Sequence, residues 1–385
     1  MSEPFAYDPS RPDFQARIYE IYRVLRDTHP VYRNPDTGVY ALSRFEDVRA
    51  AASDVQIFSS EGTSLGVGLL PHIQVMDPPR HDRLRRLVTL AFTPRRVAAM
   101  EPRVREIARG LLDRVAGKGR ADLMADYARH LPSRVIGDMI GVPPERREDF
   151  LHWTESMVAV ADGTTQEGNI RSAAAYIYGE FARLLDERRR VRRDDLMSAL
   201  LDAEIEGERL SQEELLGFCF VLIVAGNDTT TNLIANGAIL LAQYPDARRE
   251  LSADPASLED AIEEMLRCES PAQALPRRVT RELTLHGVTI QQGAEVLLVW
   301  GAANRDEREF EAPDRFDLHR RIRRHLAFGQ GLHFCLGANL ARLEARVAFE
   351  ELLARVPDYV LAEPPRFVTS VWARSPEKVA IEFQA

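Results

Sequence analysis

Apolar side chains recur every three or four residues over much of the chain, which is the period of an amphipathic helix. The segment that begins at Val97, VAAMEPRVREIARGLLDRV, shows this pattern clearly. The same period extends over about residues 79–267 and returns over 338–356. We therefore predict a helical body made of these two stretches.

Apolar and polar residues alternate, as they do in strands, only near the margins of this helical body. The clearest case is the stretch 31–42, which folds over the turn Asn34-Pro35-Asp36. We expect one domain over residues 1–385, mainly α with small β-sheets. Its β-richer parts are about 31–60, 277–300 and 366–384.

The most apolar helix is predicted from Ser211 to Tyr244. Ser211 and Glu214 have the spacing of a capping box, and Pro245 prevents the helix from continuing. Its first half is apolar on every side, which is typical of a large core or a membrane. The polar run 227–232 is a poor fit to a lipid span of about 20 apolar residues. A buried helix of a soluble protein, carrying a polar island, is the better interpretation.

The composition is that of a soluble globular protein, with 45% hydrophobic and 28% charged residues. The net charge of −9 disfavours a nucleic-acid partner, because phosphate binding requires a basic field. The N-terminal residues lack the pattern of a signal peptide or membrane anchor, so we expect a cytoplasmic protein. Cys219, Cys268 and Cys335 are too few for a disulfide framework, so a functional cysteine acts singly.

One of these cysteines lies in a glycine-rich loop, Phe328-Gly-Gln-Gly-Leu-His333-Phe-Cys335-Leu-Gly337, just before the helix predicted over 338–356. Glycines at three positions allow the backbone to wrap closely around a ligand. A buried free cysteine in a turn would also fit this pattern. Zinc is disfavoured, because only His333 could join Cys335 and nothing completes a tetrahedral site.

This loop resembles that of the cytochrome P450 superfamily, Phe-Gly-x-Gly-x-His-x-Cys-x-Gly, at every fixed position. The resemblance implies a P450 fold in which haem b lies between a long central helix and the cysteine loop with its following helix. It also implies that Cys335 is the axial thiolate ligand of the haem iron, which favours O–O bond cleavage. Phe328 and Gly337 belong to the same cofactor-binding loop.

Other segments of the chain resemble P450 motifs in the expected order. The resemblance assigns the haem propionates to His81, Arg85, His333 and Arg277, with Arg278 as the alternative to Arg277, through charge-assisted hydrogen bonds.

Glu264 and Arg267 resemble the family's Glu-x-x-Arg motif, three residues apart on one helix face. The resemblance adds Arg315, from Pro313-Asp-Arg-Phe, as the third member of a buried structural set. Removal of one member should be severely destabilising.

The polar island matches the family's oxygen-activation motif. The resemblance implies that Gly226 widens the helix beside Ala225 to admit O2, that Thr229 hydrogen-bonds the oxygen being activated, and that Asp228 supplies protons. Hydrogen bonding of Thr229 back to its own helix is the structural alternative. A gas sensor needs no such relay, so these residues favour a monooxygenase over a non-catalytic haem protein.

The chain carries no flavin or nicotinamide fingerprint, so NAD(P)H is expected to act indirectly, through a ferredoxin and a ferredoxin reductase. A basic run, Arg320-Arg-Ile-Arg-Arg324, together with Arg342 and Arg346, is a candidate surface for an acidic ferredoxin.

The resemblance also implies a mostly apolar substrate pocket. Such a pocket indicates a lipophilic substrate that is hydroxylated or epoxidised, in secondary metabolism or xenobiotic oxidation. Oxidative coupling and desaturation remain alternative outcomes. The pocket positions are Leu65, Ile73, Trp153, Met157, Ala225, Ala274, Leu275, Val371 and Trp372.

Overall fold

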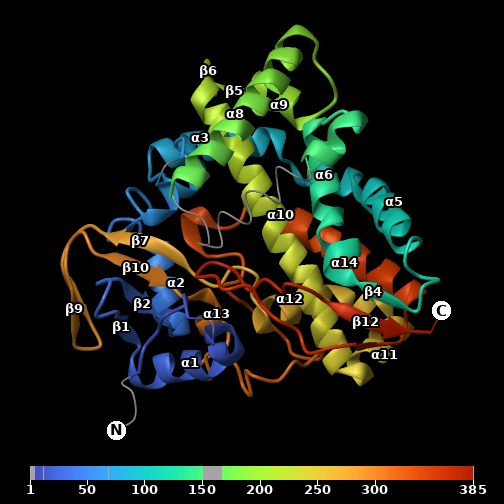
Figure 1. The fold of residues 1–385 in the computed structure, drawn as a ribbon. Helices are drawn as coiled ribbons and strands as arrows, with labels where there is room; N and C mark the ends of the chain where they lie inside the picture. The colour runs from blue at the N-terminus through green and yellow to red at the C-terminus, as the bar shows by residue number, and fades with distance from the viewer. Residues whose placement is uncertain (1–4, 12, 68, 151–166, 385) are drawn as a thin grey trace.

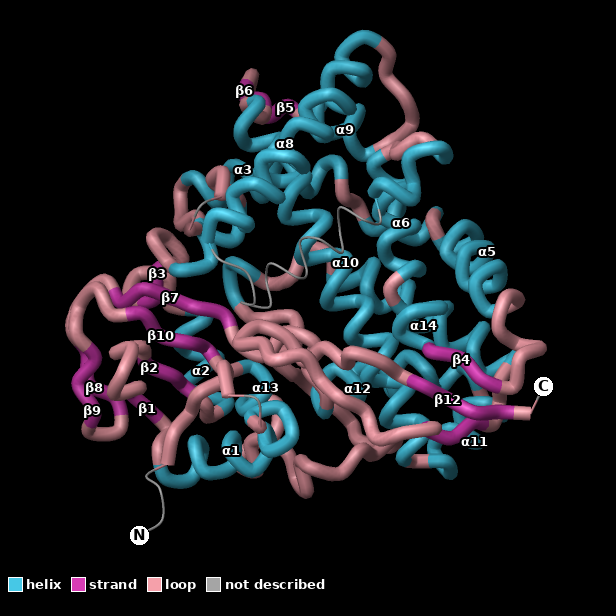
Figure 2. Tube along the Cα trace, viewed as in Figure 1, coloured by secondary structure: helices cyan, strands magenta, loops and turns pink. Residues whose placement is uncertain are grey.

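The computed structural model describes residues 5–11, 13–67, 69–150 and 167–384. Helices make up most of the molecule, and most strands gather at one corner or along one edge (Figures 1 and 2). The prediction of a mainly helical fold with small sheets is therefore confirmed. The helices are α1 (Phe14–Thr28), α2 (Phe45–Ser53), α3 (Arg80–Ala91), α4 (Pro94–Ala99), α5 (Glu101–Leu112), α6 (His130–Ile140), α8 (Glu167–Arg190), α9 (Leu196–Asp202), α10 (Gln212–Gln243), α11 (Pro245–Ala253), α12 (Leu258–Cys268), α13 (Trp300–Ala303) and α14 (Ala338–Arg355).

The largest sheet has the strand order β1-β2-β10-β7-β3, and a second has the order β11-β12-β4. The predicted hairpin at 31–42 is present, because the Asn34 side chain accepts hydrogen bonds from the N–H groups of Asp36 and Thr37. The strands are β1 (Val31–Arg33), β2 (Tyr40–Leu42), β3 (Phe58–Ser59), β4 (Arg120–Asp122), β5 (Glu204–Ile205), β6 (Glu208–Arg209), β7 (Leu275–Val279), β8 (Leu283–Leu285), β9 (Val288–Ile290), β10 (Glu295–Leu298), β11 (Tyr359–Leu361) and β12 (Ala380–Phe383).

Helix α10 runs through the middle of the molecule (Figure 1). Its predicted capping box is present: the Ser211 hydroxyl accepts from the Glu214 N–H at 3.2 Å, and the Glu214 carboxylate accepts from the Ser211 N–H at 2.8 Å. Within the described residues it is the one helix long and apolar enough to cross a membrane. Because 61% of its most apolar window is buried in the protein, it fits the core helix of a soluble fold.

The predicted structural set around Glu264 exists, but one member differs. Arg267 donates to Glu264 at 2.7 and 2.9 Å, and both side chains are completely buried. The third guanidinium comes from Arg320, whose Nε donates to Glu264 Oε1 at 3.0 Å. Arg315 is exposed and contributes only its carbonyl oxygen, which accepts from Arg267 at 3.3 Å. The assignment of the Arg315 side chain is therefore corrected to Arg320.

Candidate active site

A cavity lies between α3, α10, β7 and the loop 328–337. It contains about 1510 Å³ of space between protein atoms, its opening to solvent included. Segments from far apart in the sequence therefore meet around one space. The predicted residues that line it are Leu65, Ile73, His81, Arg85, Ala225, Thr229, Leu275, Arg277, Phe328, His333, Cys335 and Gly337.

Three predicted pocket residues do not line this cavity. Ala274, Val371 and Trp372 pack in a separate hydrophobic cluster that contains Tyr7. Ala274 is completely buried, whereas its neighbour Leu275, the first residue of β7, lines the cavity. These three residues therefore support the cluster behind the cavity rather than its wall.

Asp228 lies on α10 next to Thr229 but is not among the cavity-lining residues. The predicted pocket residues Trp153 and Met157 fall outside the described residues.

Several lining residues were not predicted as site residues. Val221 and Leu222 lie one turn of α10 before Ala225, Phe218 lies two turns before it, and all three share its cavity-facing side. Their spacing could have revealed this face once Ala225 and Thr229 were assigned to the site. Glu344 of α14 also lines the cavity, and the sequence contained no signal for it.

The cysteine loop is shaped by glycines in the left-handed region of backbone space. Gly331 has φ +71°, and a side chain there would lie 2.9 Å from the Ala52 carbonyl oxygen of α2. The Cys335 N–H donates to the Phe328 carbonyl at 2.9 Å, which closes the loop on itself. A substituted residue at 331 would both strain the backbone and push the loop from α2.

The electrostatics at Cys335 oppose a free thiolate. Burial raises the pKa of the Cys335 thiol, whereas the Gly337 N–H and the positive charges of Arg85 and Arg342 lower it. A cation bound directly to the sulfur would favour the thiolate over the buried thiol. An iron ion supplies that cation in a haem-thiolate protein.

Four basic side chains meet on one side of the cavity. His81 and His333 are in ring contact at 4.5 Å between centroids, and burial, with nearby Arg277, His81 and Arg85, lowers the pKa of His333 to about 3. Burial lowers the pKa of Arg277 to about 10, and its one hydrogen bond in the described structure goes to the Pro276 carbonyl. The buried guanidinium of Arg277 would be stabilised by an anion in the cavity beside it.

These residues fit the carboxylate edge of a haem. The buried His81 Nε2 has no hydrogen-bond partner in the described part of the chain. Arg277 and Arg278 are separated by strand alternation: Arg277 faces the cavity, whereas Arg278 is exposed and donates to the Gly62 carbonyl at 3.0 Å. Of this pair, Arg277 is therefore the one that could hold a propionate.

Helix α10 remains α-helical through the polar island, so the predicted widening at Gly226 is not observed. The Thr229 hydroxyl donates to the Ala225 carbonyl at 2.7 Å, which is the hydrogen bonding back to the helix considered above. Helix packing favours glycine at position 226, because a side chain there would lie 2.9 Å from Ile136 Cδ1 of α6.

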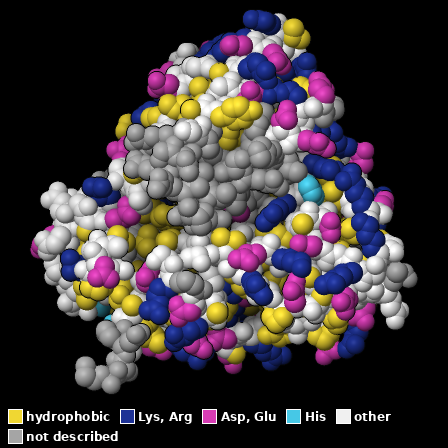
Figure 3. Space-filling model, in the orientation of Figure 1, with side chains coloured by type: hydrophobic (Ala, Val, Ile, Leu, Met, Phe, Trp, Pro, Cys, Tyr) yellow, Lys and Arg dark blue, Asp and Glu magenta, His cyan; other side chains and the backbone are white. Residues whose placement is uncertain are grey.

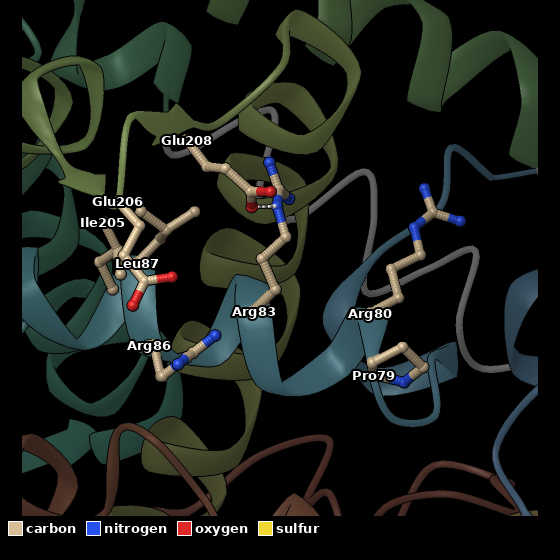
Figure 4. A pocket seen from close by; sticks show the side chains of 8 residues that line it. All are labelled: Pro79, Arg80, Arg83, Arg86, Leu87, Ile205, Glu206 and Glu208. Carbon is tan, nitrogen blue, oxygen red and sulfur yellow. Dashed lines mark hydrogen bonds and ion pairs between the residues drawn. The ribbon is translucent and has the colours of Figure 1, made fainter.

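Helix α3 has a second, outward face that is separate from the cavity. A surface pocket lies between this face and the β5–β6 hairpin, and Arg83 reaches across it to Glu208 (Figure 4). Arg83 also pairs with Glu214 at 2.8 Å, next to the start of α10. These ion pairs tie α3 to α10 and thereby fix the helix that carries His81 and Arg85.

Basic and acidic side chains are interspersed on the face of the molecule in Figure 3. The predicted docking arginines follow the same rule: Arg324 pairs with Glu309 at 2.8 Å, Arg342 with Glu263 at 2.7 Å, and Arg346 with Glu101 at 2.6 Å. Arg320 is held by Glu264. Arg321 and Arg323 are exposed and have no ion pair within the described ranges. Most of the predicted basic patch is therefore neutralised.

A cysteine in a tight loop, a cluster of basic side chains beside it and a threonine-bearing helix across the cavity are the features of a haem-thiolate protein. The family profile "Cytochrome P450" matches residues 163–255 and 256–356. The chain is 42% identical to the vitamin D(3) 25-hydroxylase of Pseudonocardia autotrophica, with 91% of this chain and 89% of that protein covered.

Two further relatives extend the comparison. The mycinamicin IV hydroxylase/epoxidase of Micromonospora griseorubida is 41% identical, and the match covers 94% of each chain. The solved structure of cytochrome P450 CYP109Q5 from Chondromyces apiculatus superposes with a TM-score of 0.91 at 39% identity, covering 98% of each chain. The chain belongs to the cytochrome P450 family, and it is a P450 monooxygenase that uses haem iron and O2.

Proposed function

We propose that this monooxygenase hydroxylates or epoxidises a lipophilic organic molecule, with haem b held by Cys335 and the propionates held by His81, Arg85, Arg277 and His333. The observation that supports it is the mostly apolar wall between α10 and the cysteine loop, which favours an apolar ligand over a charged one. When bound, the haem supplies the oxygen chemistry.

The substrate class we propose is a polycyclic or macrocyclic molecule of secondary metabolism. Two relatives are named for vitamin D(3) and mycinamicin IV, and a solved neighbour at 35% identity contains testosterone. The test is a spectral titration of the holoenzyme with a panel of steroids, macrolides and small organic acids, followed by mass analysis of products. Binding of only the acids, or products that lack an added oxygen atom, would refute this proposal.

Thr229 is the residue we propose to guide protons during the reaction, with Asp228 as its proton source. Its hydroxyl lies in the cavity wall, and rotation away from the Ala225 carbonyl would let it donate into the cavity. In Thr229→Ala we expect the haem spectrum to be retained while hydrogen peroxide release rises several-fold per NADPH consumed.

The control for this prediction is Thr231→Ala. The Thr231 hydroxyl donates to the Ala128 carbonyl at 3.2 Å, outside the cavity lining, so its loss should leave the ratio of product to peroxide unchanged. A Thr229→Ala enzyme with the same ratio as the wild type would exclude the proposed role.

For electrons, we propose a separate ferredoxin and reductase, with docking near Phe334. Phe334 directly precedes Cys335 and is 41% exposed. Arg321 and Arg323 are the arginines of the predicted basic run that no ion pair neutralises within the described ranges. An acidic ferredoxin is therefore expected to depend on these two residues more than on the paired arginines.

The corresponding prediction is that Arg321→Glu/Arg323→Glu slows reduction by an acidic ferredoxin several-fold at low salt, with little difference at high salt. Stopped-flow reduction over a range of ionic strength measures this. Arg17→Glu on α1 is the matched exposed control. Equal rates in the double variant and the control would rule out docking through these arginines.

The cellular location and the domain organisation of this enzyme are also proposals. We propose a cytoplasmic enzyme in which residues 1–385 form one domain. The burial of the apolar window of α10 inside the protein supports this placement.

A further inference from the structure

Three side chains from separate segments of the chain form a connected set beside the cysteine loop. Glu263 lies on α12, His325 lies three residues before Phe328, and Arg342 lies on the second turn of α14. The Arg342 guanidinium donates to both carboxylate oxygens of Glu263, at 2.7 and 2.8 Å, which is the bidentate geometry of a strong ion pair. The Glu263 Oε2 atom also lies 3.0 Å from His325 Nε2.

The hydrogen bonds of His325 determine which ring nitrogen carries the proton. The Ala327 N–H donates to His325 Nδ1 at 3.1 Å, so this nitrogen is an acceptor. The proton therefore lies on Nε2, which donates to Glu263. Burial raises the pKa of Glu263, but the hydrogen bonds from Arg342 and His325 outweigh burial and lower this pKa to about 2. A neutral histidine thus holds a carboxylate.

Arg342 connects this set to the cysteine that we assign as the iron ligand. The guanidinium carbon of Arg342 lies 4.5 Å from the centre of the Phe328 ring, in cation–π contact. Phe328 lines the cavity, and its carbonyl oxygen accepts from the Cys335 N–H at 2.9 Å. Burial raises the pKa of the Cys335 thiol, and the positive charge of Arg342 is one of the effects that lower it. The charge of Arg342 is therefore felt at the sulfur.

The position of this charge depends on Glu263 and His325. The Arg342 side chain is 36% exposed, and an arginine at the surface loses rotamer freedom only where partners hold it. The His325 side chain, by contrast, is 5% exposed and is fixed at both ring nitrogens. The buried histidine therefore orients the carboxylate, and the carboxylate orients the guanidinium.

We propose that His325 and Glu263 are positioning residues that hold the Arg342 charge beside Cys335, and that this charge raises the reduction potential of the haem iron. The inference rests on the proposed ligation of the iron by Cys335. A positive charge near the sulfur stabilises the thiolate, which then donates less electron density to the iron. The iron therefore accepts the single electron from the redox partner more readily.

The first test is a potentiometric titration of the holoenzyme. Arg342→Gln should have a more negative midpoint potential than the wild type, with the thiolate-type spectrum retained. The matched control is Arg346→Gln, which removes an arginine one turn later on α14 that pairs with Glu101 and Glu350. This control should keep the wild-type potential. An Arg342→Gln enzyme with the wild-type potential would overturn the proposal.

The second test uses two conservative variants of His325 that separate its two hydrogen bonds. His325→Asn keeps an acceptor for the Ala327 N–H but is too short to reach Glu263, whereas His325→Gln places an amide donor where Nε2 lies. We expect the potential of His325→Asn to shift toward that of Arg342→Gln, and that of His325→Gln to stay near the wild type. In the double variant His325→Asn/Arg342→Gln, the change at His325 should add no further shift.

A merely structural role of His325 would give a different result. His325→Asn would then lower the midpoint of urea unfolding without moving the reduction potential, and the proposal would be overturned. A wild-type enzyme whose reduced carbon monoxide complex lacks the long-wavelength Soret band would instead refute ligation by Cys335, on which the proposed function depends. Unchanged potentials with that band present would refute only the role of Arg342 and its two positioning residues.

Discussion

Replacement of Cys335 with serine is expected to abolish the long-wavelength Soret band of the reduced carbon monoxide complex. The band reports thiolate ligation, and the wall of the cavity supplies no second sulfur ligand from Cys219 or Cys268, neither of which lines it. Loss of the axial ligand should reduce monooxygenase activity by at least about 100-fold, because even outer-shell changes around a metal typically cost 10–100-fold.

The matched control for this prediction is Cys219→Ala. Cys219 is completely buried on α10, in contact with the Met197 sulfur, and its pKa is raised to about 12 by burial. It behaves as a small apolar side chain, so its removal should preserve the spectrum and turnover. A Cys335→Ser protein that keeps the thiolate-type spectrum would exclude Cys335 as the ligand.

The features that the sequence predicted well are those encoded over short distances. The cysteine loop, the capping box of α10 and the hairpin at 31–42 each depend on residues within about ten positions. Glycine conformations, side-chain caps and turn residues act locally, so their structural result can be predicted before the fold is known. The resemblance to the P450 family implied the cavity as well. His81, Arg277 and Thr229 lie in its wall, as the resemblance implies.

The features that the sequence could not predict depend on distant partners. Strand β4 lies inside the stretch predicted as helical because its partner β12 is near the end of the chain, at Ala380–Phe383. The sequence around Arg342 does not indicate that Glu263, 79 positions earlier, is its ion-pair partner. Glu344 lies on a helix with acidic and apolar residues on several sides, so only the packed structure shows that it faces the cavity.

The replacement of Arg315 by Arg320 as the third member of the Glu264 set also depends on a partner that is distant in the sequence. Arg320→Ala is expected to lower the free energy of unfolding by about 2 kcal/mol, since one charge-assisted hydrogen bond to a buried carboxyl group contributes about 1.5–3 kcal/mol. Glu264→Ala should be more damaging, at about 3–5 kcal/mol, because it leaves the buried Arg267 without its counter-ion. Arg315→Ala should change the free energy of unfolding by less than about 0.5 kcal/mol, as is usual for an exposed side chain.

Urea unfolding followed by circular dichroism and by haem release measures these differences. The order expected for the unfolding midpoints is wild type equal to Arg315→Ala, then Arg320→Ala, then Glu264→Ala. The reverse order for the two arginine variants would show that the Arg315 side chain, despite its exposure, is the true third member. The contrast is informative because the two arginines lie on the same short segment of the chain. Only Arg320 directs its guanidinium at Glu264 Oε1, where the Asp317 N–H also donates at 3.0 Å. That shared acceptor links the Glu264 network to the chain segment leading into the cysteine loop, so loosening of haem should accompany loss of stability in Arg320→Ala.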